Sequence, residues 1–382
     1  MKIEELRAYN GTFEPVKESC YINNHIHTTH SFSPYTPSQA VYTAYKNGLA
    51  TAGIVDHDTT AGAREFIEAG KRIGMPVTVG AECRIDMSGT SLCGKRLNNP
   101  DQISVAYVAM HGIPHGSIEK VDDFLAPYRA KRNIRNRAMI ERINALVGAF
   151  GVGIDFEGDV LPLSTTSVTE RHLLFALAKK ITAKYTTPAD VISFMNDTMG
   201  ISVSGKNRDN ILNGDKTPEF YEYDILGVLK GNLVEKIYVD ADAELPKVEE
   251  YIDMVRRCGG ISAYAYLGDV VSSVTGDKKA QKFEDDYIEE LFDVIENVGF
   301  DAVTFMPTRN TEAQLDRVME LCKERGLFQI SGEDINSPRQ KFVCPAYENP
   351  KFAHLVEAAH TLIKYENLAD SDLSAARKLI GK

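Results

Sequence analysis

The chain has 382 residues, of which 43% are hydrophobic and 25% are charged, an ordinary composition for a globular protein. This length accommodates one large barrel with insertions or two domains. The net charge of -11 comes from 54 acidic and 43 basic residues, and it argues against general affinity for nucleic acids or anionic membranes. We therefore expect no stable nucleic-acid partner, and an anionic substrate needs a dedicated pocket.

The cysteines and the apolar segments indicate a cytoplasmic protein. The 6 cysteines include no Cys-x-x-Cys pair, and each lies in or beside an apolar run, so we expect them to be reduced. The first residues contain no apolar core of signal-peptide length. No stretch of about 18 apolar residues occurs, so we expect no membrane partner.

In chain order, residues 21–30 begin as a strand and end in a polar run. On a strand, His25 and His27 point to one face while Ile26 points to the other. Two imidazoles on one face can hold one side of a divalent ion, and the polar run places both at the end of the strand. The alternative is a pair of histidines that bond only to backbone groups, so this motif alone does not establish a metal site.

Two further strand–helix units follow. Residues 49–55 form an apolar strand that runs into Asp56-His57-Asp58, and residues 77–82 form a strand that ends on Glu82. Helices are expected between these strands, over 39–46 and up to residue 73. Three consecutive strands therefore end in side chains of metal-ligand type.

The same alternation of helix and strand returns after a long middle section. Its elements are expected at residues 245–257, 261–266, 284–298, 301–306, 311–325 and 327–331. The last strand runs into Asp334. This alternation predicts a parallel sheet or barrel, in which chemistry gathers at the C-terminal ends of the strands. Asp334 is therefore expected beside the histidines and Glu82.

Taken together, these blocks resemble the PHP (polymerase and histidinol phosphatase) superfamily, in its metal-dependent phosphoesterase branch. The matching pieces are His25-Ile26-His27-Thr28, Asp56-His57-Asp58-Thr59, Gly80-Ala81-Glu82, Glu170-Arg171-His172-Leu173 and Gly332-Glu333-Asp334. Each piece is short, but their order and their strand-end placement agree with the family. The resemblance implies an α/β fold, a distorted (β/α)7 barrel of the PHP type with helical insertions.

The resemblance also implies a division of the chain. We expect the first part of the barrel at 1–115, a helical insertion at 116–165, a return to the barrel at 166–185, a second insertion at 186–236, and the last part of the barrel with C-terminal helices at 237–382. The sequence does not reveal the role of the second insertion.

This sequence retains only some of the ligands that the family has at its metal positions. The first position keeps His25, His27, Glu82 and Asp334. The second keeps Glu82 and His172, but it offers Tyr266 where the family has a histidine. Two of three positions thus retain strong ligands. We expect one firm divalent metal, manganese, zinc or iron, with a second metal left open.

The third position has lost most of its ligands. Phe32 and Ser33 stand where the family usually has an acidic residue or histidine, which leaves His57 and Asn336, too few for tight zinc binding. We expect no third metal unless another side chain fills the gap. The further candidates for metal contact are His30, Asp58 and His111.

Basic residues of the insertions are candidates for binding a substrate phosphate. Arg132 and Arg135 share one face of a helix and could form bidentate bonds to phosphate. The alternative is a solvated basic face. Lys206 and Arg208 of the second insertion are further candidates, as is Arg171 beside the possible ligand His172.

The resemblance implies an enzyme that hydrolyses a phosphate ester of a small anionic substrate: a nucleotide, a short oligonucleotide or a phosphorylated metabolite. The metal would lower the pKa of a water and withdraw charge from a phosphoryl oxygen. His57 or Asp58 would protonate the leaving oxygen, and Arg171 would hold the phosphate. Two alternatives remain: a metal- or ligand-binding protein of PHP fold without catalysis, and an amidohydrolase that cleaves C–N bonds.

Overall fold

The computed structural model describes residues 1–16, 19–270 and 281–382. Its centre is a sheet of seven strands in the order β1-β2-β3-β4-β5-β6-β7. The strands are β1 (Ile22–Ile26), β2 (Thr51–His57), β3 (Val77–Asp86), β4 (Val105–His111), β5 (Ile261–Ala265), β6 (Ala302–Phe305) and β7 (Phe328–Ser331). The predicted distorted barrel with helical insertions is confirmed.

Backbone hydrogen bonds between β1 and the segment after β7 bring the two edges of the sheet together. The N–H of His27 donates to the Ile335 carbonyl at 2.9 Å, and the N–H of Ile335 donates to the His25 carbonyl at 3.1 Å. The Asn24 side chain also donates to the Ser331 carbonyl at 2.8 Å. The sheet is therefore nearly closed, and β1 lies beside the end of β7.

One strand differs in direction from a simple parallel barrel. β4 pairs antiparallel with both β3 and β5, while the other neighbouring pairs are parallel. The apolar residues of β4 are compatible with a strand, but they carry no information on its direction. A loop rather than a helix connects β3 to β4, which permits the reversal.

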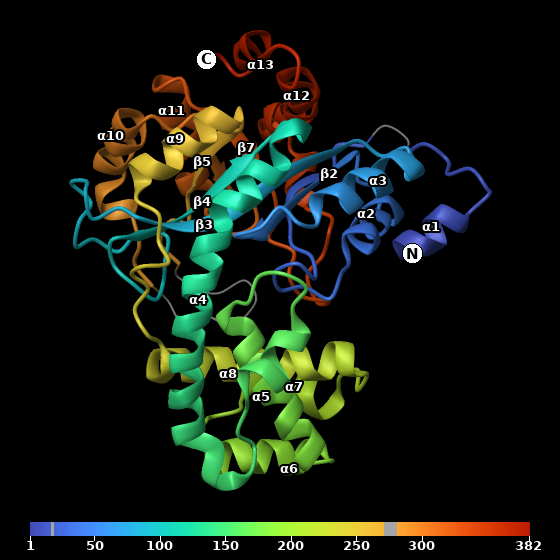
Figure 1. The fold of residues 1–382 in the computed structure, drawn as a ribbon, viewed down its shortest axis with the longest axis vertical. Helices are drawn as coiled ribbons and strands as arrows, with labels where there is room; N and C mark the ends of the chain where they lie inside the picture. Colours follow the sequence, from blue (N-terminus) through green and yellow to red (C-terminus); the bar gives the residue numbers. More distant parts are fainter. Residues whose placement is uncertain (17–18, 271–280) are drawn as a thin grey trace.

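Helices cover the barrel (Figure 1). They are α1 (Ile3–Ala8), α2 (Pro37–Lys46), α3 (Ala63–Ile73), α9 (Val248–Cys258), α10 (Ile288–Val298), α11 (Glu312–Glu324), α12 (Ala353–Ala369) and α13 (Leu373–Leu379). Local signals set their ends. Thr36 and Gln39 form a capping box at the start of α2, and α3 ends at Gly74, whose φ of 77° suits glycine.

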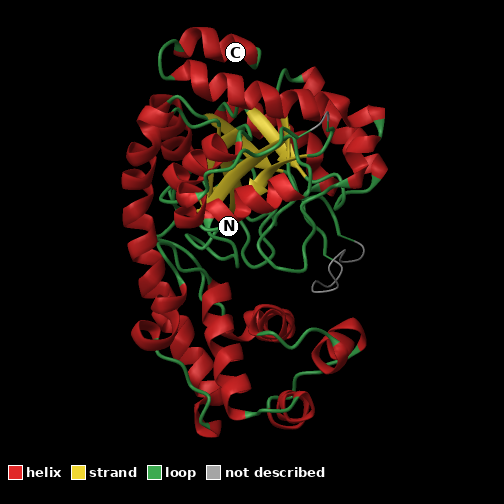
Figure 2. Cartoon of the chain, turned by 90° about the vertical axis from the view of Figure 1, so that its right-hand side faces the viewer, coloured by secondary structure: helices red, strands yellow, loops and turns green. Residues whose placement is uncertain are grey.

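A separate helical layer lies below the barrel (Figures 1 and 2). It contains the distal half of α4 (Ile118–Val147) with α5 (Glu170–Lys184), α6 (Pro188–Ser193), α7 (Gly205–Asn213) and α8 (Pro218–Ile237). These helices share a hydrophobic core of their own. Figure 2 shows the strands confined to the upper part and only helices and loops in the lower part.

Helix α5 occupies most of residues 166–185, which were expected to return to the barrel. Leu173, Leu177 and Ile181 of α5 recur at four-residue spacing, and all three are buried in the core of the helical layer. Their apolar stripe packs with α8 rather than with the sheet. The two expected insertions therefore form one helical unit with α5 inside it.

All 6 cysteines are free, as expected. Within the described parts of the chain, no helix combines the length and the apolar character that crossing a membrane would demand.

Candidate metal centre

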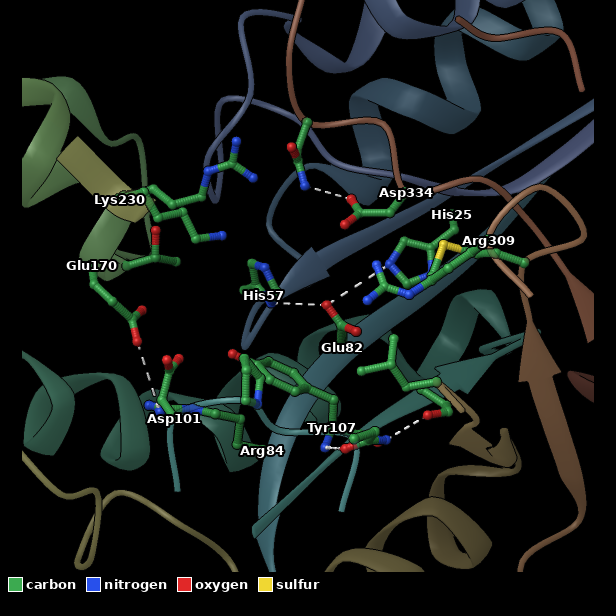
Figure 3. Close-up of a pocket in the computed structure, with 18 of the residues that line it drawn as sticks. His25, His57, Glu82, Arg84, Asp101, Tyr107, Glu170, Lys230, Arg309 and Asp334 are labelled. Carbon is green, nitrogen blue, oxygen red and sulfur yellow. Dashed lines mark hydrogen bonds and ion pairs between the residues drawn. The ribbon is translucent and has the colours of Figure 1, made fainter. Parts of the chain in front are cut away.

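The register of the sheet brings the predicted ligands together. His57 at the end of β2 pairs with Glu82 of β3, and Ile26 of β1 forms a bridge with Ile335. The second pairing places the histidines that flank Ile26 beside Asp334. Figure 3 shows His25, His57, Glu82 and Asp334 converging on one space.

Glu82 and His27 occupy the centre of this cluster. Glu82 Oε2 lies 3.0 Å from His57 Nδ1 and 3.8 Å from both His25 Nε2 and His27 Nε2. His27 Nε2 lies 3.2 Å from Asp334 Oδ1. These atoms form two groups of three that could hold an ion: His25 with His27 and Asp334, and His27 with His57 and Glu82.

The surroundings of the two His27 ring nitrogens indicate whether a divalent metal fits this cluster. Its Nε2 is buried and has no hydrogen-bond partner among the described residues, although two carboxylates are close. A buried polar atom without a partner is costly, and a cation bound by this nitrogen would remove the cost. On the other side of the ring, Nδ1 lies 3.5 Å from Ser31 Oγ, an outer contact of the kind that orients ligating histidines. The residues present therefore fit a divalent metal.

The charges of the cluster suit a cation as well. Burial lowers the pKa of His27, and the neighbouring His57 lowers it further, so the ring is neutral. Burial raises the pKa of Glu82, but His57 and His25 outweigh it and hold the pKa well below its usual range. Burial also raises the pKa of Asp334, but the adjacent His27 ring and the charges of His25 and Arg171 hold the pKa well below its usual range. Two ionised carboxylates and a neutral imidazole are the states that ligate metals.

His172, expected at a second metal position, belongs to neither group. His172 Nδ1 accepts the Thr169 N–H at 3.0 Å, and its ring packs edge-on against Phe32 at 4.8 Å. Burial lowers the pKa of His172 to about 3. The Tyr266 hydroxyl donates to Asp285 at 2.6 Å. The role of His172 stays a prediction.

Asn336 and His30 are engaged with other side chains. The Asn336 amide donates to Asp334 Oδ1 at 2.5 Å and so orients a ligand. His30 Nδ1 lies 2.8 Å from Thr166 Oγ1. His30 belongs to neither of the two groups above.

His111 lies inside the barrel. Ala109 of β4 pairs with Glu82, and His111, two residues further along, faces the same side of the sheet. Burial lowers its pKa to about 3, and it belongs to neither candidate group.

Arg132 and Arg135 were expected either to bind phosphate or to form a solvated basic face, and their surroundings match neither expectation. Arg132 and Arg135 are only 4% and 6% exposed, so they form no solvated face. Arg132 forms ion pairs with Asp58 and Glu244, and Arg135 Nε donates to Glu244 at 2.8 Å. Both guanidinium groups are thus committed to carboxylates of the protein, which argues against their binding a substrate phosphate.

Lys206 and Arg208 do not reach the pocket either. Both are exposed on α7, and neither lines the pocket at the metal centre. Their prediction as phosphate-binding residues rested on charge alone, and the helical layer contributes residues of α5 and α8 to this pocket instead.

The pocket above the cluster has a volume of about 280 Å³. Its lining includes His25, His57, Glu82 and Asp334 at one end and residues of α5 and α8 at the other. Arg171 also lines it, as predicted for a substrate contact. The Arg171 guanidinium lies 5.0 Å from the centre of the Phe32 ring, and its buried Nε has no hydrogen-bond partner in the described parts of the chain.

Some lining residues escaped the sequence reasoning. Arg84 follows Glu82 by two positions on β3 and therefore faces the same way, a signal that could have identified it. Tyr107 of β4 lies opposite Arg84 in the register. Lys230 comes from the middle of α8, where no local motif marks it.

Comparisons with known proteins identify solved structures with a similar fold. No family model matches the chain. A proposed metal-dependent phosphoesterase from Bifidobacterium adolescentis has a TM-score of 0.54 and 23% identity, over 84% of this chain and 90% of that one. An amidohydrolase from Chromobacterium violaceum, with bound sulfate and no metal, has a TM-score of 0.54 and 16% identity, over 89% of this chain and 96% of that one.

One curated relative matches in sequence. A 5′-3′ exoribonuclease from Haemophilus influenzae is 32% identical over 68 residues, which are 18% of this chain. The match spans 25% of that relative's length. The chain therefore shares its fold with a proposed metal-dependent phosphoesterase, in agreement with the PHP-type phosphoesterase that its sequence resembles.

Proposed function

We propose that this chain is a metal-dependent hydrolase that cleaves a phosphate ester of a small anionic substrate. The observation that carries the proposal is the buried Nε2 of His27, which has no hydrogen-bond partner in the described structure and lies between Asp334 and Glu82 at one end of a pocket. A site of this kind is expected to hold a cation and to admit a small molecule.

His25, His27, Glu82 and Asp334 are the residues that would hold the metal. Their nitrogen and oxygen atoms suit manganese, zinc or iron, and ligand type alone does not choose among these. When bound, the cation supplies Lewis acidity, activating water at neutral pH and withdrawing charge from a phosphoryl oxygen. Asn336 holds the carboxylate of Asp334 in place.

Arg171 and His57 would act on the substrate. Arg171 presents its guanidinium to the pocket with one N–H left unbonded among the described groups, and a guanidinium binds phosphate well. His57 lines the same pocket, and Glu82 orients its Nδ1 at 3.0 Å, so the ring is placed to give a proton to the leaving oxygen. Asp58 is not assigned this role, because its carboxylate is paired with Arg132.

Phosphate is favoured as the reacting group for two reasons. A cation and Arg171 at one end of the pocket suit a compact anion. The related fold from Chromobacterium violaceum has bound sulfate, which resembles phosphate in shape and charge. The pocket volume of about 280 Å³ favours nucleotides, short oligonucleotides or phosphorylated metabolites over polymers.

Hydrolysis of a C–N bond is the second candidate, because the fold also matches a protein described as an amidohydrolase over 89% of this chain. Binding without catalysis is the third, because the hydroxyl of Tyr266, which stands at the expected second metal position, donates to Asp285. All three candidate functions include a bound metal. They differ in whether a substrate is hydrolysed and in the class of that substrate.

Metal analysis combined with a substrate panel separates these candidates. The purified protein, supplied with Mn²⁺, is assayed on phosphomonoesters, phosphodiesters, short oligonucleotides and amides. We expect metal-dependent turnover of a phosphate ester. Glu82→Gln should lower bound metal and turnover by at least about 100-fold, since losing even an outer partner of a ligand costs about 10- to 100-fold. The matched control is Glu68→Gln on α3, whose carboxylate pairs with Arg7.

The outcomes are distinct. Turnover of amides alone would establish the second candidate, and bound metal without turnover on any class would establish the third. Full metal content in Glu82→Gln would show that the ligand assignment is wrong.

A further inference from the structure

Helix α4 passes from one hydrophobic core to the other. Val121 and Leu125 near its start are buried in the core of the barrel, whereas Ile143 and Val147 near its end are buried in the core of the helical layer. The segment between them carries Arg132 and Arg135, both buried. These arginines therefore lie at the junction of the two cores, beside the ends of β2 and β3.

A neutral network of charged side chains fills this junction. Glu244 pairs with all three arginines of the network: Arg84, Arg132 Nε at 3.4 Å and Arg135 Nε at 2.8 Å. Glu170 lies 4.0 Å from Arg84 and 3.8 Å from Arg135. Arg132 also forms an ion pair with Asp58. The guanidinium groups of Arg84, Arg132 and Arg135 thus balance the carboxylates of Asp58, Glu170 and Glu244.

Asp58 is held at the edge of the metal centre by its backbone. Its φ of 54° lies in the left-handed region, which is strained for a residue other than glycine. Its N–H donates to the Glu82 carbonyl at 2.7 Å, and its carbonyl accepts from Arg129 at 2.7 Å. Asp58 directly follows His57, and both line the pocket.

We propose that Arg132 is a positioning residue that keeps the Asp58 carboxylate out of the metal centre and so limits the number of ions bound there. The proposal rests on the metal site of the proposed function. Asp58 is 3% exposed, and Arg132 is the one cation with which its carboxylate is seen to pair in the described structure. Arg132 therefore supplies the positive charge that a second ion would otherwise supply.

Removal of the guanidinium would leave a buried carboxylate without compensation, which is unfavourable. Asp58 would then attract another cation. His57 beside it offers a nitrogen ligand, and this combination of nitrogen and oxygen ligands suits a divalent ion. The structural role of the network predicts only a loss of stability when Arg132 is replaced, so a gain of metal distinguishes the two roles.

The test measures bound Mn²⁺ rather than activity. Wild-type protein and Arg132→Met are equilibrated with excess MnCl₂ and desalted, and the metal is quantified by mass spectrometry. We expect Arg132→Met to bind more Mn²⁺ than the wild type, by about one equivalent. The double variant Arg132→Met with Asp58→Asn should return to the wild-type value. Arg135→Met is the matched control, because it breaks a contact to Glu244 but none to Asp58.

A folded Arg132→Met protein with the same or a lower Mn²⁺ content would overturn the proposal, as would an equal gain in Arg135→Met. If Arg132→Met does not fold, Arg132→Gln combined with Glu244→Gln keeps the network neutral and is measured in the same way. A wild-type protein that binds no Mn²⁺ would overturn the proposed function itself. Wild-type binding without a gain in the variants overturns only the role of Arg132.

Discussion

His27 has a buried ring nitrogen that lacks a hydrogen-bond partner in the described structure, although Asp334 lies 3.2 Å away and Glu82 3.8 Å away. The Asn336 amide donates to Oδ1 of Asp334, the oxygen that lies closest to His27. At the scale of single residues, the metal centre therefore consists of ligands and of the neighbours that fix their orientation. Substitution of either kind of residue can therefore test the site.

Asn336→Ala should weaken metal binding without removing a ligand. The variant leaves Asp334 free to rotate, and loss of such an outer partner typically costs about 10- to 100-fold in affinity. Titration with Mn²⁺ followed by calorimetry measures the dissociation constant. An unchanged constant would mean that the contact at 2.5 Å does not orient Asp334.

The buried carboxyl group of Glu284 leads to a prediction about how the free energy of unfolding depends on pH. Burial raises the pKa of this carboxyl to about 8 from its ordinary 4.5. Its Oε1 accepts the Leu267 N–H at 3.1 Å, and its Oε2 has no partner in the described parts of the chain. Between pH 4.5 and 8 the folded chain holds a proton that the unfolded chain has released. The free energy of unfolding should therefore fall as pH rises, by at most about 1.4 kcal/mol per unit from this group.

Glu284→Gln should flatten this part of the pH profile, because an amide does not titrate. Urea unfolding of both proteins at pH 5, 6, 7 and 8 measures the difference. Parallel profiles in the two proteins would show that Glu284 does not carry the effect.

At the scale of elements, helix ends and strand ends follow from local sequence. The capping box of Thr36 and Gln39 is present at α2, and β1 and β2 end where polar residues begin. The third strand was expected to end on Glu82, but β3 continues to Asp86. The direction of a strand and the core in which a helix packs do not follow from local sequence. β4 reverses because a loop precedes it, and α5 joins the helical layer because its apolar stripe fits α8.

Thr36→Ala tests the cap. The Thr36 side chain accepts the Gln39 N–H at 3.3 Å, so its loss should lower the free energy of unfolding by about 1 kcal/mol. Chemical denaturation measures the change, and the metal content should stay at the wild-type value. A loss of metal would mean that α2 also positions β1.

At the scale of the whole molecule, the pocket depends on how the helical layer sits on the barrel. Besides the arginine network, Arg339 of the barrel donates to both carboxylate oxygens of Asp224 on α8, at 2.5 and 2.6 Å. Lys230 of the same helix lines the pocket. The position of α8 therefore affects the substrate end of the site.

Asp224→Asn should loosen the layer by weakening this contact. We expect faster hydrogen exchange in α8 and a raised KM for the phosphate ester, while the metal content stays unchanged. Unchanged exchange in α8 would show that the arginine network alone holds the layer.

The sequence predicted the metal cluster better than the walls of the pocket, for a physical reason. Strand alternation and strand ends are local, and they led to the expectation that His25, His27, Glu82 and Asp334 lie together, although β3 continues four residues beyond Glu82. Ion pairs between distant segments are not local. Arg132 lies 112 residues from Glu244, so nothing in its own helix indicated that it would be buried and neutralised.

The central claim, a cation bound at His27 between Asp334 and Glu82, is tested most directly by anomalous scattering from crystals soaked with Zn²⁺. The account predicts a peak at the zinc edge about 2.0–2.1 Å from His27 Nε2. The peak should disappear in Asp334→Asn crystals, or lose most of its height. A well-ordered cluster with no anomalous peak near His27 would contradict the account.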